Sequence, residues 1–465
     1  MTITLDAGAS SRRRLKRHAS ELVRLGTPVV LSRAGSTILL VLDVVMVGRA
    51  GTEELAFQSI GFAVANTVQM IGLGLLLGTL VTAAAAIGRG APLEAGQAWR
   101  RSVPYAATLG ALGAAFCLTG PYWLPLLGQP PELAAGAGTV IAIIGLSLPG
   151  QLLFLTSSFF LEGIGRPLAA TVTILLAVIL KAFLNWVLVF GNLGAAELGA
   201  EGAAIGLVAV RTLMGIALVV WILLMYGRSH GTRVPWRGGW RPWRTQRRIG
   251  QADGASLGLE SAAFTALNLM AGLLGAVHVA SYAIALNLLS ILFTFALGIG
   301  AASAVRVGMA FGRRDAPDLA IAGWTGLAIH SLAIALVGLP LILVPGLVVS
   351  AYSSDPAVLA LAGSMVPLLV LTLFADGGQR VVAQALRGCG DTWVPTLSHL
   401  FAYVFVMFPL GWYLGVVLDL GGPGLLLAIA IASVVSVSVL IARFVYLSRV
   451  RLPRRFAEPG EPPAI

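Results

Sequence analysis

The sequence predicts an all-α polytopic membrane protein, and composition, segment length and the placement of basic residues each support that class. Of the 465 residues, 57% are hydrophobic and only 11% are charged, and the mean hydropathy is +0.89. A soluble domain usually carries about 25% charged residues, so much of the apolar surface must face lipid rather than water. The same composition excludes a disordered chain and a coiled coil.

Twelve transmembrane helices are expected when the long uncharged segments are divided at charged residues and at Gly and Pro clusters. A helix needs about 20 mostly apolar residues to cross a bilayer, and the segments lack the alternation of a β-barrel. The first six helices are expected over residues 26–48, 56–87, 103–127, 138–162, 168–190 and 202–226. The last six are expected over residues 252–275, 280–311, 319–349, 358–384, 395–417 and 423–447.

Basic residues lie almost entirely on one side of these helices. They occur in the N-terminal tail, in alternate loops, in the segment Arg228–Arg248 and in the C-terminal tail, whereas the opposite loops contain only Arg49. Loops rich in Lys and Arg stay in the cytoplasm, so both termini are expected there. This placement explains the net charge of +11 without nucleic acid. The tryptophans of the central segment, Trp236, Trp240 and Trp243, indicate contact with membrane lipids.

The two halves of the chain resemble each other. At an offset of 224, residues 41–60 align with residues 265–284, and Gly88-Arg89 aligns with Gly312-Arg313. At an offset of 225, residues 161–167 align with residues 386–392. Chance similarity between Gly-rich helices is the alternative, but the matches fall at the same helix ends. We therefore expect two six-helix lobes related by pseudo-two-fold symmetry about the membrane normal, with the substrate held between them.

These observations divide the chain into five segments. They are a basic cytoplasmic tail (1–25), a first lobe (26–226), a basic cytoplasmic linker (227–250), a second lobe (251–448) and a cytoplasmic C-terminal tail (449–465). Cys117 and Cys389 have no CxxC motif or nearby His, so neither a disulfide nor a metal site is expected from them. No nucleophile–base or metal-ligand constellation indicates an enzyme, and no cofactor is expected.

Ionisable residues inside the predicted spans are expensive to bury and therefore need a partner or a function. Glu260 and Asp376 each lie roughly eight residues, or about 12 Å, from the cytoplasmic end of a span. Two carboxylates at one depth predict a site for protons or for a cation such as Na⁺, because burial raises their affinity for protons. The alternative for Asp376 is a simple ion pair with Arg380, one helical turn away.

Asp43 and Lys181 both lie toward the outer half of their spans. A lysine inside the bilayer is rare, and a buried ion pair between these two residues is the simplest way to satisfy both. Asp43 is then either a structural residue or part of a switch. His330 and His399 are isolated in spans, where packing is favoured over proton relay.

Several stretches resemble the multidrug and toxic compound extrusion (MATE) family, in its bacterial NorM-type branch. They are LDVVMVG (42–48), LNWVLVFG (184–191), LESAAF (259–264), the segment 285–312 and ADGGQRVVAQALRGCGDTWVP (375–395). The resemblance covers residues 20–448. It implies a bacterial inner-membrane transporter with a central cavity, which exports cationic, amphipathic compounds in exchange for Na⁺ or H⁺.

The same resemblance assigns roles by position. Glu260 and Asp376 match the acids of the second lobe that couple cation flow to transport, so the resemblance implies that these two residues could bind Na⁺. Asp43 matches the corresponding acid of the first lobe. Asp355 matches an outer acid that contacts substrate in some members, although in this sequence it also reads as a helix cap before a proline.

One departure from the family pattern concerns the first lobe. The Asn-x-x-x-Asn pattern of the family is here Lys181-x-x-x-Asn185. The ammonium would occupy the place of a coupling ion, so cation coupling at Asp43 is not expected. In the second lobe, Thr372 stands one turn before Asp376, where some members carry an aromatic residue.

The expected function is therefore secondary active multidrug efflux by a monomer that binds small cationic molecules, Na⁺ or H⁺, and membrane lipids. One alternative is a flippase for lipid-linked oligosaccharides, which would need Arg33, Arg211 and Arg380 in the cavity to hold a diphosphate. Another is a membrane scaffold or receptor without transport, against which the repeat and the paired acids argue.

Overall fold

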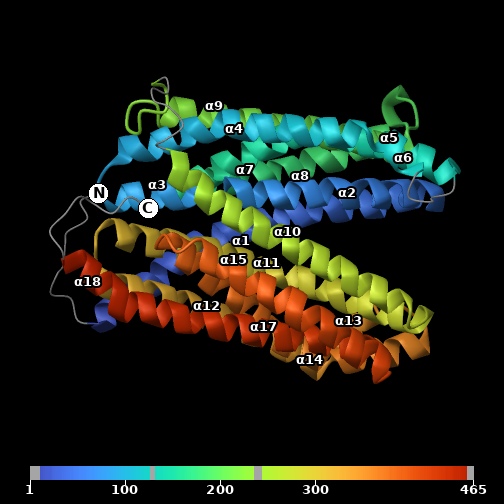
Figure 1. The fold of residues 1–465 in the computed structure, drawn as a ribbon. Coiled ribbons are helices and arrows are strands. Elements are labelled where there is room, and N and C mark those ends of the chain that lie inside the picture. The colour runs from blue at the N-terminus through green and yellow to red at the C-terminus, as the bar shows by residue number, and fades with distance from the viewer. Residues whose placement is uncertain (1–10, 126–130, 235–242, 458–465) are drawn as a thin grey trace. The chain divides into compact units, whose positions relative to one another are not determined.

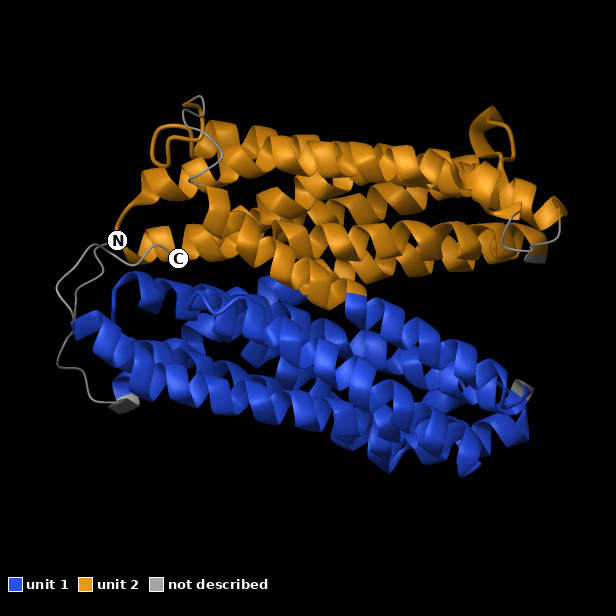
Figure 2. Cartoon of the chain, in the orientation of Figure 1, with its two compact units in different colours: residues 1–30, 259–465 blue, residues 31–258 orange. Residues whose placement is uncertain are grey.

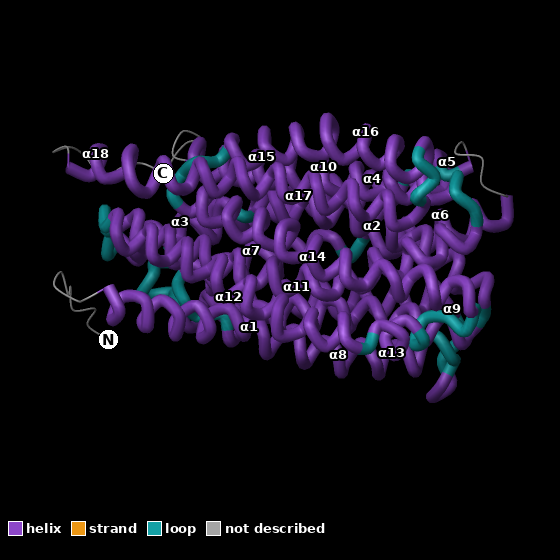
Figure 3. The backbone as a smooth tube through the Cα atoms, turned by 90° about the horizontal axis from the view of Figure 1, so that it is seen from below, coloured by secondary structure: helices purple, strands orange, loops and turns teal. Residues whose placement is uncertain are grey.

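The computed structural model describes residues 11–125, 131–234 and 243–457, and every regular element in those residues is a helix (Figures 1 and 3). In the described residues nine helices are long and apolar enough to cross a membrane, and one bent pair makes a tenth. With α4 and α10, which are 27 and 29 residues long, each of the twelve expected spans falls on a helix. The chain is therefore a multi-pass helical membrane protein. Trp236, Trp240 and the end of the C-terminal tail lie outside the described residues.

The helices follow the expected order. Those of the first half are α1 (Ser11–Ala50), α2 (Thr52–Leu76), α3 (Gly78–Gly88), α4 (Pro92–Leu118), α5 (Gly120–Trp123), α6 (Pro131–Gly145), α7 (Leu148–Gly163), α8 (Leu168–Leu188), the turn η2 (Asn192–Gly194) and α9 (Gly199–Met225). Those of the second half are α10 (Arg244–Gly272), α11 (Ala276–Gly312), α12 (Ala316–Leu343), α13 (Pro345–Val349), α14 (Pro356–Gly388), α15 (Trp393–Leu400), η4 (Phe401–Met407), α16 (Phe408–Gly411), η5 (Trp412–Val417), α17 (Gly421–Tyr446), η6 (Leu447–Arg451) and α18 (Leu452–Ala457).

The chain forms two compact units (Figure 2). Unit 1 contains residues 1–30 and 259–465, and unit 2 contains residues 31–258. The first part of α1 therefore belongs to the same unit as the second half of the chain, and α10 passes from unit 2 into unit 1. The boundaries fall inside two continuous helices rather than in loops.

Each unit is built around one central helix. In unit 2, α7 packs against α3, α4 and α9; in unit 1, α14 packs against α11, α12 and α17. Fourteen of the sixteen residues of α7 are buried. Side chains that point away from the units remain apolar, as Ile179 (69% exposed) and Leu336 (68%) illustrate. Such side chains face lipid in a membrane protein.

The internal repeat is visible in the geometry of equivalent turns. After α3, the amide of Ala91 donates to the carbonyl of Ala86 at 2.9 Å; after α11, the amide of Asp315 donates to Ala310 at 3.1 Å. Gly90 and its counterpart Arg314 both have positive φ, 75° and 59°. The turns at residues 162–166 and 387–391 repeat each other likewise, with Gly165 and Gly390 at φ 75° and 84°.

Several expected spans differ in detail from the structure. Helix α1 begins at Ser11 rather than near residue 26, so residues 11–25 are helical. The span expected over 138–162 is bent by 41° between α6 and α7, where Pro149 in the first turn of α7 has no amide hydrogen to donate. The span expected over 395–417 contains two π-helical segments, η4 and η5.

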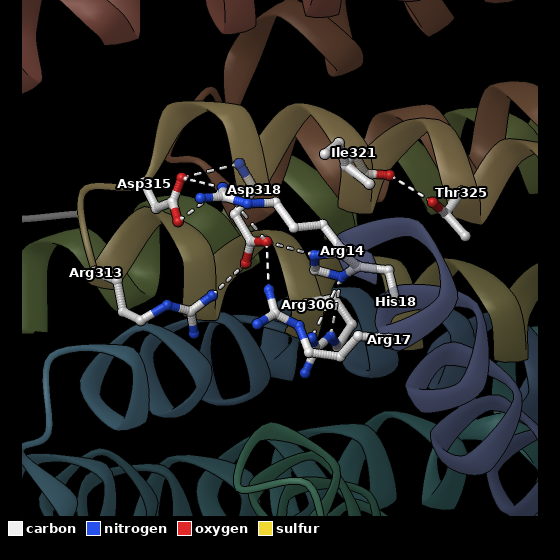
Figure 4. Close-up of polar contacts among 9 residues, drawn as sticks. All are labelled: Arg14, Arg17, His18, Arg306, Arg313, Asp315, Asp318, Ile321 and Thr325. Carbon is white, nitrogen blue, oxygen red and sulfur yellow. Dashed lines mark hydrogen bonds and ion pairs between the residues drawn. The ribbon is translucent and has the colours of Figure 1, made fainter. Parts of the chain in front are cut away.

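The helical start of α1 is held within unit 1 by an ionic cluster (Figure 4). The buried carboxylate of Asp318, in the first turn of α12, contacts Arg17 Nη2 at 2.5 Å, His18 Nε2 at 2.9 Å and Arg313 Nη2 at 2.6 Å. Arg306 Nη2 donates to the other ring nitrogen of His18 at 3.3 Å. The basic residues expected in a solvated tail therefore fold against α12.

Candidate functional site

Asp376 lies in the middle of α14 and is 1% exposed. Its Oδ1 accepts hydrogen bonds from Gln379 Nε2 at 2.8 Å and from Ser433 Oγ of α17 at 3.1 Å. Its Oδ2 has no hydrogen-bond partner in the described part of the chain. A buried carboxylate normally uses both oxygens, so Asp376 retains one oxygen for a proton or a cation.

Glu260 approaches the same region from α10. The buried phenol of Tyr403, in η4, lies within electrostatic range of both Glu260 and Asp376. Gln379 Nε2 also donates to the Tyr403 hydroxyl at 3.1 Å. Both predicted acids of the second half therefore act electrostatically on one tyrosine, within unit 1. Glu260 itself is half-buried.

Arg380 is buried and interacts electrostatically with Asp376. The hydrogen bonds of Asp376, however, come from Gln379 and Ser433. Neutral amide and hydroxyl groups thus supply these two hydrogen bonds, and the guanidinium of Arg380 adds an electrostatic interaction with the same carboxylate.

Two histidines lie near these acids in unit 1. His330 Nε2 contacts the carbonyl of Leu373 at 3.2 Å, one turn before Asp376. The ring of His399 stacks on Tyr403 with centroids 5.6 Å apart. Both histidines are buried among helices, which agrees with a packing role.

The Asp43–Lys181 pair inferred from the sequence is present in unit 2. Lys181 Nζ lies 2.7 Å from Asp43 Oδ1, and both side chains are buried. Lys181 also donates to Asn185 Oδ1 at 2.8 Å and to the carbonyl of Ala203 at 2.6 Å, which uses all three of its donors. Asn185 Nδ2 in turn donates to Asp43 Oδ1 at 2.8 Å.

A second cation stands close to this pair. Arg211 of α9 interacts electrostatically with Asp43, and its Nη1 donates to Ser147 Oγ at 3.0 Å. One carboxylate therefore faces two fixed positive charges. The cluster carries an excess of positive charge, which disfavours binding of a further cation at Asp43.

Glu162, in the last turn of α7, is a buried acid that sequence reasoning missed. It is 3% exposed, and its Oε1 lies 3.5 Å from Arg33 Nη2 and accepts a hydrogen bond from Ser158 at 2.9 Å. In the sequence, residues 161–167 stand out only as part of the repeat. The available signal was an acid placed inside a predicted span, at residues 138–162.

Asp355 stands apart from the other acids. It is exposed and precedes α14, where its Oδ1 accepts from the amides of Ala357 at 2.8 Å and Val358 at 3.4 Å. This is the helix-cap geometry expected from the sequence. The remaining oxygen is available to solvent.

Sequence comparisons identify relatives along almost the whole chain. The MatE family model matches twice, over residues 28–187 and 255–413. A probable multidrug resistance protein NorM from Caulobacter vibrioides is 38% identical over 428 residues, covering 91% of this chain and 90% of that protein. A second protein of the same name, from Mesorhizobium japonicum, is 31% identical and covers 97% and 99% of the two chains.

Solved structures share the fold. The eukaryotic MATE transporter AtDTX14 superimposes with a TM-score of 0.85 at 20% identity, covering 95% of this chain and 100% of its own. An outward-facing MATE family transporter of the MOP superfamily gives a TM-score of 0.82 at 18% identity, covering 97% and 99%. The two matches of the family model coincide with the two halves of the repeat.

Proposed function

The chain belongs to the MATE family, and from this premise we propose that it exports cationic, amphipathic compounds in exchange for Na⁺ or H⁺ by alternating access. The bacterial relatives are named multidrug resistance proteins, which supports multidrug efflux. The basic loops support a location in the inner membrane with both termini in the cytoplasm.

The proposed coupling rests on the carboxylate of Asp376, which accepts hydrogen bonds at only one of its two oxygens in the described residues. One of its oxygens is free of hydrogen bonds in the described residues, and Glu260 adds a second negative charge near Tyr403. Ionised, the two acids attract a cationic drug; neutralised by a proton or by Na⁺, they release it. Drug and coupling ion must then weaken each other's binding by the same factor.

The neighbours of Asp376 are compatible with either ion. A proton needs only Oδ2. A sodium ion needs several oxygens, and Ser433 Oγ and Gln379 Oε1 could join the carboxylates of Asp376 and Glu260. Gln379 Oε1, like Asp376 Oδ2, is buried without a hydrogen-bond partner in the described residues.

A lipid-linked oligosaccharide flippase is less well supported. It would need basic residues available for a diphosphate. Arg33 pairs with Glu162, Arg211 bonds to Ser147 and Arg380 interacts electrostatically with Asp376, so all three candidate arginines already have protein partners.

Transport by purified protein in proteoliposomes tests the proposal. Ethidium, a planar aromatic cation, serves as the probe, and Na⁺ and pH gradients are imposed separately. We expect one of the gradients to drive ethidium transport by the wild type. Glu260→Gln and Asp376→Asn should each reduce that flux about 5- to 150-fold, the factor that corresponds to a typical coupling free energy of about 1–3 kcal/mol.

The matched control is Glu94→Gln, which removes an exposed acid paired with Arg89. It should leave the flux unchanged. Normal gradient-driven transport by Glu260→Gln would overturn the assignment of Glu260, and absence of transport by the wild type under both gradients would overturn the proposed function.

A further inference from the structure

Glu162 is a buried acid of unit 2 whose carboxylate has few partners in the described residues. Its two contacts, Arg33 at 3.5 Å and Ser158 at 2.9 Å, both fall on Oε1. Oε2 has no hydrogen-bond partner in the described residues. An ionised carboxylate can accept about four hydrogen bonds, and leaving half of it bare in a buried site is costly.

Another buried acid of the same unit, Asp43, provides a contrast. Asp43 has an ammonium at 2.7 Å, an amide at 2.8 Å and a guanidinium in electrostatic range. For Glu162, Arg33 is the one charged group with an electrostatic effect in the described chain. In the part of the chain that the structure describes, the charge of Glu162 therefore depends on one long ion-pair contact, with Arg33 of α1.

Arg33 has a second interaction that keeps it in place when Glu162 is neutral. Its guanidinium lies 5.3 Å from the ring centroid of Phe159, one turn of α7 before Glu162. A guanidinium above an aromatic face is stabilised by the ring quadrupole. Arg33 can thus lose its carboxylate partner without becoming an unpaired buried charge.

We propose that Glu162 is a proton-binding site of unit 2, loaded and unloaded once in each transport cycle; this inference rests on the proposed antiport. The incoming proton bonds to Oε2, the carboxylate becomes neutral, and Arg33 keeps its charge over Phe159. A proton fits better than a metal ion because Ser158 is the only other oxygen ligand at this carboxylate in the described contacts and a guanidinium lies beside it. Divalent cations need several oxygen ligands.

The position of Glu162 suits this exchange. It lies one residue before the end of α7, on the side that the basic loops assign to the cytoplasm. The central helix of unit 1, α14, carries Asp376, and its repeat counterpart α7 carries Glu162. Because the ammonium of Lys181 already pairs with the carboxylate of Asp43, the proton site of unit 2 lies at Glu162 rather than at Asp43.

The number of protons exchanged per ethidium tests the proposal. In proteoliposomes without sodium, opposing ethidium and pH gradients are varied until net flux stops, and this balance point gives the stoichiometry. We expect Glu162→Gln to exchange about one proton fewer per ethidium than the wild type. Glu94→Gln, which removes an Arg-paired acid that is 57% exposed, should match the wild type. Equal stoichiometry in Glu162→Gln and the wild type would overturn the proposal.

Infrared spectroscopy gives a second readout that needs no transport. The difference spectrum between acidic and alkaline pH contains the bands of carboxyl groups that gain protons. Glu162→Gln should lose one such band and Glu94→Gln should keep it; an unchanged spectrum in Glu162→Gln overturns the proposal. If the wild type transports no ethidium, the proposed antiport fails, and this spectrum still decides whether Glu162 binds a proton.

Discussion

Asp43 is surrounded by groups that contact its carboxylate directly. Lys181 lies 2.7 Å from it, and Asn185 bonds to both partners. The carbonyl of Ala203 takes another hydrogen of the ammonium. A sodium ion at Asp43 would have to displace a cation that is covalently attached to α8. We therefore interpret the cluster as structural and the acids of unit 1 as the coupling residues.

A double-mutant cycle tests the pairing. Asp43→Asn leaves a buried ammonium without its counter-ion, and Lys181→Met leaves a buried carboxylate, so each should destabilise the protein by about 3–5 kcal/mol. The double variant should lose less stability than the two single variants lose in sum, with an interaction free energy of about 1–3 kcal/mol. Thermal unfolding of purified protein gives all three values. Strict additivity would show that the two charges do not interact.

The sequence indicated some of these residues and not others. An acid or a base inside a span is rare, which is why Asp43, Lys181, Glu260 and Asp376 were recognisable. Neutral polar residues in spans are common, so nothing marked Gln379, Ser433 or Tyr403 as neighbours of Asp376. They come from α14, α17 and η4, and only the packing of these helices brings them together.

At the scale of elements, equivalent turns of the repeat have acquired different surroundings. Arg89 pairs with Glu94 at 2.7 Å, and their counterparts Arg313 and Asp318 pair at 2.6 Å. Glu94 is 57% exposed, whereas Asp318 is fully buried. The start of α1 accounts for the difference, because Arg17 and His18 cover Asp318 (Figure 4).

This contrast makes a prediction about the start of α1. Asp318→Asn removes the shared partner of Arg17, His18 and Arg313, so residues 11–25 should detach more often from unit 1. Trypsin cleavage after Arg14 and Arg17 should accelerate at least about tenfold, the change that 1.4 kcal/mol of local stability produces.

Glu94→Gln is the matched control for this experiment. It alters the equivalent turn of unit 2, but an exposed ion pair contributes at most about 1 kcal/mol, and cleavage in α1 should not change. Equal cleavage rates for the wild type and Asp318→Asn would show that the cluster does not hold α1.

The elements themselves were largely predictable, since each of the twelve expected spans falls on helices in the part of the chain that the structure describes. The deviations have local causes that only the packed structure shows. The bend between α6 and α7 lies beside Pro149, which was visible in the sequence as a proline inside an expected span. The early start of α1 was not visible, because a run of basic residues indicates a solvated tail until a buried acid such as Asp318 is available to pair with it.

At the scale of the whole molecule, the uneven distribution of charge predicts how the chain is inserted. The basic residues lie in the tails, in alternate loops and in the linker, and the acidic loops lie opposite. Positively charged loops are retained in the cytoplasm. The net charge of +11 is then explained by the predicted topology, and we propose that the few charges within the helices act in transport.

Cysteine labelling in whole cells tests this orientation. Ser354 precedes α14 and Ser229 follows α9, and both are exposed. A membrane-impermeant maleimide should label Ser354→Cys in intact cells and Ser229→Cys only after permeabilisation. The native Cys117 and Cys389 are 0% and 5% exposed, so the wild type should remain unlabelled and serves as the control. The reverse pattern would mean that the acidic loops face the cytoplasm, and Glu162 would then exchange its proton with the outside.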